Sequence, residues 1–249
     1  MFFIIFFVLG CIWGSFSNVC IYRIPADKSV IFTRSFCPNC KKTIKWSDNI
    51  PLVSFLLLKR KCRNCDYKIS YQYFIVELIS AISFTIIYYF YGLSITSLLL
   101  IILTIFFIII FFIDLRHFII PNTLTFPLMF IGFVKSFDPN LNNFLFPNYI
   151  NSLIGGITGY LIIWLIIFAY KKIRNKEGMG LGDAKLLSAI GFWFGWYSIP
   201  FVLFLSSIIA LGIALPSLIK KSKNLSSQIP FGPYIILGIT LYIFIKHII

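Results

Sequence analysis

Residues 98–113 read LLLIILTIFFIIIFFI, and the next residue is Asp114. Thr104 is the only polar residue in this run. A helix needs about 20 predominantly apolar residues to cross the hydrocarbon core of a bilayer. With its flanking residues the run reaches that length. The sequence therefore predicts a membrane-spanning helix over residues 94–113, with a carboxylate directly at its end.

Apolar segments of similar character recur along the whole chain. The complete set of predicted spans is 1–21, 71–91, 94–113, 123–134, 150–170, 184–196, 199–218 and 231–249. Hydrophobic residues make up 59% of the chain and charged residues only 12%, whereas a soluble domain has about 25% charged residues. We therefore expect an all-α polytopic membrane protein with about eight transmembrane helices, of which the fourth and sixth are short.

Positive charge is concentrated in alternate loops between the predicted spans. Of the 22 Lys and Arg residues, only Lys135 and Lys246 fall in the other set of loops. Because cytosolic loops carry an excess of Lys and Arg, the basic loops are predicted to face the cytosol and both termini to lie outside. The net charge of +14 indicates a surface suited to anionic membrane lipid, and no nucleic-acid partner is needed to explain it.

The longest polar segment, residues 23–70, contains two pairs of cysteines. They are Cys37-Pro-Asn-Cys40 and Cys62-Arg-Asn-Cys65, with 21 residues between the pairs. Two such pairs can supply the four thiolates of a tetrahedral zinc site, and a cytosolic location disfavours disulfides. We expect a structural zinc ion in this small module, because four thiolates leave no position open for a substrate. Unbound thiols or a redox pair are the alternatives.

Two aspartates, Asp114 and Asp183, are predicted to lie at the cytosolic edge of the membrane. An ionisable group at that depth is costly and is a functional candidate. Two carboxylates can hydrolyse a peptide bond without a metal, one as the base and the other as the acid. Gly178, Gly180 and Gly182 precede Asp183 and would let an extended substrate approach the backbone closely. The alternatives are a helix cap at Asp183 and a solvated helix end at Asp114.

One further acid, Glu77, is expected next to an apolar span on the same side. It is a candidate site residue, and an interfacial carboxylate paired with Lys or Arg is the alternative. Other functional classes also remain open. A proton-coupled transporter would be expected to carry its acids near the middle of the bilayer. A membrane scaffold with a zinc module would use the cysteines but leave the aspartates without a role.

These residues together resemble the bacterial type IV prepilin peptidases, also called leader peptidase/N-methyltransferases, over nearly the whole chain. Besides the cysteine pairs and Asp114, the segments that carry the resemblance are residues 14–25 (GSFSNVCIYRIP), 46–55 (WSDNIPLVSF), 69–70 (IS), 76–78 (VEL), 120–122 (IPN) and 178–186 (GMGLGDAKL).

The resemblance implies an activity. The family cleaves the basic leader of prepilins and pseudopilins at the cytosolic face of the bacterial inner membrane. Many members then methylate the new N-terminal residue with S-adenosylmethionine. Asp114 and Asp183 would be the protease pair, and Glu77 is a candidate for binding the methyl donor. A peptidase without methyltransferase activity is the alternative.

The resemblance also implies a division of the chain. Residues 1–22 would form the first transmembrane helix. Residues 23–70 would form the cytosolic four-cysteine module and the methyltransferase part, and residues 71–249 the transmembrane peptidase bundle.

Overall fold

A computed structural model describes residues 2–31, 34–142, 145–174, 180–219 and 229–248. The chain forms two compact units, Met1–Ile109 and Ile110–Ile249. The boundary between these units lies within a long apolar helix. The division of the sequence into 1–22, 23–70 and 71–249 stays a prediction.

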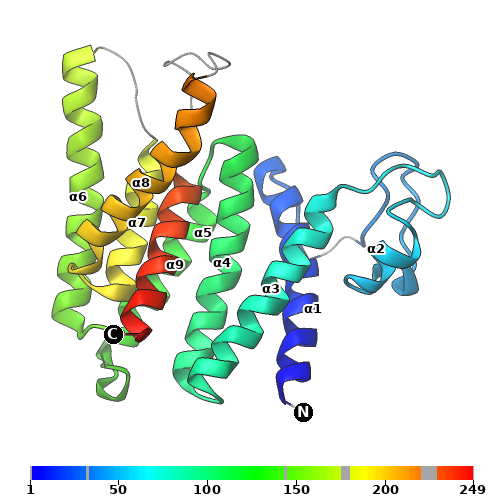
Figure 1. The fold of residues 1–249 in the computed structure, drawn as a ribbon, viewed down its shortest axis with the longest axis horizontal. Coiled ribbons are helices and arrows are strands. Elements are labelled where there is room, and N and C mark those ends of the chain that lie inside the picture. The colour runs from blue at the N-terminus through cyan, green and yellow to red at the C-terminus, as the bar shows by residue number, and fades with distance from the viewer. Residues whose placement is uncertain (1, 32–33, 143–144, 175–179, 220–228, 249) are drawn as a thin grey trace. The chain divides into compact units, whose positions relative to one another are not determined.

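The regular structure of the described residues is helical, apart from two isolated β-bridges in the segment between α1 and α3 (Figure 1). The α-helices are α1 (Phe2–Arg23), α2 (Val53–Leu57), α3 (Tyr71–Tyr91), α4 (Ile95–His117), α5 (Asn122–Val134), α6 (Tyr149–Arg174), α7 (Leu181–Phe194), α8 (Ser198–Ile219) and α9 (Gly232–Ile248). Short 3-10 helices are η1 (Ile24–Ala26), η2 (Trp46–Asn49), η3 (Lys135–Phe137) and η4 (Pro139–Leu141). Every predicted span coincides with a helix, so the all-helical fold is confirmed.

Five of these helices, α1, α3, α4, α6 and α8, are long and apolar enough to cross a membrane. Their large apolar side chains are widely exposed, as at Ile4 and Phe204, which is the pattern expected where lipid replaces water as solvent. Helices α5, α7 and α9 are shorter. The membrane character is therefore confirmed, whereas the number of eight spans stays a prediction. Helix α4 continues to His117, four residues beyond the predicted end of this span.

In the first unit, α1 packs on α3 at glycines one turn apart. A Cβ atom on Gly10 would lie 2.5 Å from the Cα of Ala81, and one on Gly14 would lie 2.6 Å from the Cα of Glu77. The two backbones are therefore in direct contact. This is the small-residue packing by which helices associate in membranes, where no hydrophobic effect drives them together.

In the second unit, α6 and α7 also pack closely through glycines. Gly155 and Gly191 face each other with no room for a side chain on either. A Cβ atom on Gly159, one turn further along α6, would lie 2.7 Å from the carbonyl oxygen of Leu187. Helix α7 is thus held closely against α6 along its length, and this packing fixes the helix that carries Asp183.

A buried tryptophan joins α5 to the other side of α7. Trp193 is fully buried, and its Nε1 donates to the carbonyl oxygen of Leu128, 2.8 Å away. Gly132 leaves space for the indole ring, since a Cβ atom there would lie 2.5 Å from it. The buried Nζ of Lys135 donates to the carbonyl oxygen of Trp193, 2.9 Å away. Helix α7 is therefore fixed at its C-terminal end as well.

Candidate active site and cysteine module

The two predicted aspartates are both buried. Asp114, near the end of α4, is 4% exposed, and Asp183, in the first turn of α7, is 7% exposed. The two carboxyl groups lie within electrostatic range of each other. They belong to the same compact unit although 68 positions separate them in the chain. The structure therefore brings the two residues near each other, and their role as a catalytic pair stays a prediction.

Neither aspartate occupies the position that its structural alternative requires. The N-cap of α7 is Gly180, whose backbone is extended (φ −83°, ψ 146°), so Asp183 lies in the first turn and not at the N-cap position. Its carboxylate reaches back and accepts the backbone N–H of Gly180. Its backbone N–H donates to the carbonyl oxygen of Gly180 at 3.1 Å. Asp114 is not a solvated helix end, because its carboxylate is buried and α4 continues beyond it to His117.

A backbone N–H from a distant helix holds the carboxylate of Asp114. The N–H of Gly232, in the first turn of α9, donates to Oδ2 of Asp114 at 3.0 Å. The first N–H groups of a helix have no partner inside the helix and are available for this purpose. A Cβ atom on Gly232 would lie 2.7 Å from the same oxygen. Glycine is therefore the residue that allows α9 to approach the carboxylate.

Ile120 lies between the elements that carry the site. Its side chain would be 3.0 Å from a Cβ atom on Gly232 and also 3.0 Å from one on Gly182. The chain reaches Ile120 by a sharp turn after α4, in which Phe118 has a positive φ of 57° and donates to the carbonyl oxygen of Asp114. This turn brings α4, α7 and α9 around one apolar side chain.

The three glycines predicted for substrate approach differ in their surroundings. Gly178 lies outside the described residues. Gly180 is exposed, and a Cβ atom on it would meet only Oδ2 of Asp183, 3.9 Å away, and the backbone of Gly182. Gly182 packs against Ile120 instead. The role of these glycines in binding a substrate stays a prediction.

The four predicted cysteines converge in the first unit. Ligand atoms of Cys37, Cys40, Cys62 and Cys65 all lie within 4.8 Å of one another, and the four thiols are free. The Sγ atoms of Cys37 and Cys65 are 3.7 Å apart. In a tetrahedral site with Zn–S bonds of about 2.3 Å, two sulfurs lie about 3.8 Å apart. The geometry of the cluster therefore suits a zinc ion.

Each cysteine pair is carried by the same type of backbone hairpin. In the first hairpin the N–H of Cys37 donates to Lys42, and the N–H of Lys41 donates back to Cys37. The outer bond, from Ile44 to Ser35, closes that hairpin.

The second hairpin has the same bonds 25 positions later. Cys62 donates to Tyr67, Asp66 donates to Cys62, and Ile69 donates to Arg60. Lys41 and Asp66, at corresponding positions, both have positive φ, 59° and 51°. In each hairpin the second cysteine accepts a backbone hydrogen bond from the residue two positions later, and the bond from Tyr67 lowers the pKa of Cys65 to about 6. The two hairpins are thus structural repeats.

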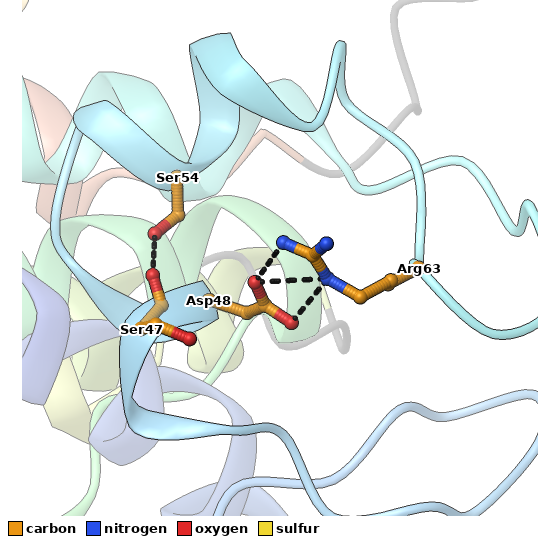
Figure 2. A network of polar contacts seen from close by, with 4 residues as sticks. All are labelled: Ser47, Asp48, Ser54 and Arg63. Atoms are coloured by element: carbon orange, nitrogen blue, oxygen red, sulfur yellow. Dashed lines mark hydrogen bonds and ion pairs between the residues drawn. The ribbon is translucent and has the colours of Figure 1, made fainter.

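An ion pair fastens the segment between the hairpins to the second one. Figure 2 shows Asp48 of η2 facing Arg63, with Nη2 of Arg63 2.6 Å from Oδ1 and Nε 2.9 Å from Oδ2. The hydrogen bond from Arg63 holds the pKa of Asp48 below its usual value. Ser54 of α2 donates to the carbonyl oxygen of Ser47 at 3.1 Å. Helix α2 is therefore linked through η2 to the cysteine cluster.

Glu77 is buried and bonded to the backbone of this module. Its Oε2 accepts the N–H of Leu52 at 2.8 Å, and only 7% of the residue is exposed. Leu52 has φ 58° and ψ −47°, and the N–H of Val53 donates to the carbonyl oxygen of Pro51 at 2.6 Å. These values describe a γ-turn of the rare, strained type. Among the described residues Glu77 forms no ion pair, so the alternative of a Lys or Arg partner is wrong there.

Comparison with known proteins shows the family. The profile described as the bacterial peptidase A24 N-terminal domain matches residues 8–91, and that of the type IV leader peptidase family matches residues 101–215. A prepilin leader peptidase/N-methyltransferase from Aeromonas hydrophila is 34% identical, with 94% of this chain and 88% of that protein covered. The chain belongs to the type IV leader peptidase family. The prediction of an enzyme of this family is thereby confirmed.

Relatives in other bacteria resemble this leader peptidase family member to the same degree. Proteins of the same name from Vibrio cholerae and Neisseria gonorrhoeae are 37% and 35% identical, covering 97% and 91% of this chain and 96% and 84% of their own lengths. No solved structure matches. The four cysteines and Glu77 lie in the N-terminal match, and Asp114 and Asp183 lie in the C-terminal match.

Sequence reasoning missed Gly232 in the aspartate site of this family member, and it singled out Ile120 only as part of the IPN segment that resembles the family. Gly232 lies beyond the matched peptidase segment, between Pro230-Phe231 and Pro233. A glycine between prolines at the start of an apolar helix marks a helix N-terminus with free N–H groups, and that signal could have identified it. Ile120 carries no chemical signal, and only the fold shows that it lies between the elements of the site.

Proposed function

We propose that this protein cleaves the basic leader of prepilins or pseudopilins at the cytosolic face of the bacterial inner membrane, with Asp114 and Asp183 as the catalytic pair. The observation that carries the proposal is the burial of both carboxyls within range of each other's charge, in a chain of the leader peptidase family. Neither carboxyl has a cationic partner among the described residues. A buried carboxyl without such a partner is energetically costly, and a catalytic role accounts for the presence of two.

The chemistry needs one proton on the pair. Two neighbouring carboxyls resist ionising together, so one is ionised and the other protonated. The ionised carboxyl takes a proton from a water molecule, whose oxygen attacks the carbonyl carbon of the scissile peptide. The protonated carboxyl donates its proton to the carbonyl oxygen, which gives a neutral tetrahedral intermediate.

Collapse of this intermediate restores the pair. One hydroxyl of the intermediate returns its proton to the carboxyl that gave one, and the carbonyl re-forms. The carbon–nitrogen bond breaks, and the leaving nitrogen receives the proton first taken from water. The pair again holds one proton, and the only net reactant consumed with the peptide is water.

Gly232 supports this cycle by fixing one carboxyl. Its N–H occupies Oδ2 of Asp114 and leaves Oδ1 to the reaction. Ile120 keeps apolar surface beside the pair, which strengthens electrostatic interactions there because the local dielectric constant is low. Gly180 is the exposed described glycine next to Asp183, and we assign to it the approach of an extended substrate backbone.

The cysteine module is proposed to bind zinc as a structural cross-link. Cys37, Cys40, Cys62 and Cys65 would hold the ion, which would join the two hairpins and carry no substrate, since four thiolates complete its coordination. Such an ion would stabilise the fold of a segment as small as this one.

Methyl transfer from S-adenosylmethionine is proposed as a second activity, because the relatives carry the name N-methyltransferase. The described contacts of Glu77 fit the cofactor poorly, since one oxygen of its buried carboxylate is already bound to the N–H of Leu52. We therefore derive no step through Glu77. Its role as a ligand of the methyl donor stays a prediction, and a peptidase without methyl transfer is the alternative.

The test uses purified protein in liposomes with a prepilin carrying a Gly-Phe junction, with and without labelled S-adenosylmethionine. We expect cleavage by the wild type and a loss of at least about a thousandfold in Asp114→Asn and Asp183→Asn. Asp27→Asn is the matched control, because Asp27 is exposed and its positive φ suits Asn equally. Unchanged cleavage in either buried-site variant would disprove the assignment, and cleavage without label transfer would leave a peptidase only.

A further inference from the structure

Helix α2 presents an apolar face that the described residues leave exposed. Val53, Leu56 and Leu57 occupy positions i, i+3 and i+4, which share one side of a helix. They are 47%, 65% and 77% exposed. The opposite side is packed, since Ser54 is buried and the ring of Phe55 lies against aromatic rings of α3.

This face is held in place by defined bonds. Ser54 donates to the carbonyl oxygen of Ser47 in η2, and Asp48 of η2 is paired with Arg63 (Figure 2). The N–H of Leu52, at the start of α2, is bound by Glu77. The exposed leucines are therefore part of a fixed surface and not of a loose chain.

The contacts with α3 place α2 beside the membrane-spanning part of that helix. Helix α3 begins at Tyr71 and is long and apolar enough to cross a membrane. Glu77 lies six residues into it, which corresponds to about 9 Å along the axis. Its bond to Leu52 therefore places the start of α2 alongside α3, inward from the N-terminal end of that helix. The ring of Phe55 is also 5.2 Å from that of Phe74, in the first turn of α3.

Charged and aromatic side chains surround the apolar face in sequence. Lys59 and Lys61 follow α2, and Lys45 precedes η2, and all three are exposed. Trp46, the first residue of η2, is 80% exposed. An apolar helix face flanked by basic residues and an exposed indole is the composition of segments that lie in the membrane interface. Each lysine adds attraction to an anionic leaflet.

We propose that α2 lies in the headgroup region of the anionic leaflet next to α3, with Val53, Leu56 and Leu57 in the upper acyl chains. Interfacial helices bury their apolar face about 5–10 Å below the headgroups, which agrees with the depth at which Glu77 holds Leu52. The occupant of this face is lipid, and the module is held to the membrane at this point in addition to its attachments through α1 and α3.

The test introduces a tryptophan into this face of α2, in the full chain in nanodiscs. Leu57→Trp is compared with the wild type in anionic lipid with and without bromine on the upper acyl chain, so that the difference reports the added indole alone. We expect bromine to reduce this added emission at least about twofold. Lys68→Trp, at an exposed position of the second hairpin that is not part of the proposed face, is the matched control and should lose little emission. Leu56→Trp repeats the measurement at a second position of the face.

Two outcomes would overturn the proposal. One is equal quenching of Leu57→Trp and Lys68→Trp, with thiol reactivity of the four clustered cysteines unchanged to show that the module keeps its fold. The other is fluorescence of the introduced tryptophan that bromine does not quench but that shifts to the blue when a prepilin peptide is added. That result would show that the face binds a polypeptide. Quenching of equal strength in neutral lipid would remove the requirement for an anionic leaflet.

Discussion

The ammonium group of Lys135 donates to the carbonyl oxygen of Trp193, in the last turn of the helix whose first turn carries Asp183. The carbonyl groups at the end of a helix carry partial negative charge and its first N–H groups partial positive charge. Helix α7 therefore has a buried cation at one end and a buried acid at the other. The ring of Phe146 lies 3.9 Å from the same ammonium group and adds to its attraction.

Burial of Lys135 should make stability depend on pH. Burial lowers the pKa of this amine to about 7 from its usual 10.5. Between pH 7 and 10 the unfolded chain therefore binds more protons than the folded protein, so this residue makes stability rise with pH. We expect the melting temperature of the wild type to rise by a few °C more than that of Lys135→Met between pH 6.5 and 9.

The measurement is thermal unfolding in nanodiscs at the two pH values. Lys68→Met, which removes an exposed lysine, is the control and should follow the wild type. An equal pH response in wild type and Lys135→Met would contradict the predicted change of protonation.

A methyl group at Gly232 should impair cleavage. In Gly232→Ala the Cβ atom would lie 2.7 Å from Oδ2 of Asp114 and 3.0 Å from Ile120, so α9 or the carboxylate must move. Displacement of a reacting group by about 1 Å can reduce the rate about a hundredfold. We expect a loss of this size in kcat with a smaller effect on KM. Gly212→Ala is the control, because nothing lies within 4 Å of a Cβ atom there, and wild-type kinetics in Gly232→Ala would contradict the proposed contact.

A methyl group at Gly159 should instead reduce stability. The Cβ atom of Gly159→Ala would lie 2.7 Å from the carbonyl oxygen of Leu187 and would separate α6 from α7. Such overpacking usually costs about 1–3 kcal/mol. We expect a lower melting temperature in nanodiscs, with cleavage retained below it. Leu161→Ala, at an exposed position of the same helix, should have a small effect, and equal melting of the two variants would contradict tight packing at Gly159.

Removal of the metal should affect the cysteine module much more than the aspartate site. The four cysteines lie in the first compact unit and the aspartates in the second. We expect one zinc ion per chain by elemental analysis, and loss of that ion in Cys65→Ser. We also expect methyl transfer to fall more than cleavage does. Cys11→Ser, which changes a buried thiol outside the cluster, should keep the zinc. A zinc-free wild type that unfolds at the same temperature would argue against a structural ion.

Local patterns in the sequence predicted most of the fold and part of the site. Hydropathy located every long helix, because a span needs its apolar residues in one continuous stretch. Cysteine spacing located the cluster for a similar reason, since one turn presents both thiols of a pair. Each pair also has Asn before its second cysteine and Ile four positions after it, and that regularity could have revealed the repeated hairpin.

Contacts between distant segments were not predictable in the same way. The donor to Asp114 is a backbone N–H 118 positions away, and no property of the Gly232 side chain indicates its partner. The γ-turn at Leu52 is similar, because leucine has no preference for positive φ. Glu77 holds that turn in place, so its conformation follows from the packing of the whole unit.

The repeated hairpin also has a consequence for the assembly of the module during translation. Each hairpin offers two sulfurs, and a closed four-sulfur site needs both. At a translation rate of 5–20 residues per second, the second hairpin leaves the ribosome roughly 1–5 s after the first. The nascent chain must carry its first pair of thiols unprotected through this interval, after its first membrane helix has already been synthesised. With the proposed zinc bound, finished copies would hold all four thiolates as metal ligands. Zinc shortage or oxidative stress would then damage this protein chiefly during its synthesis.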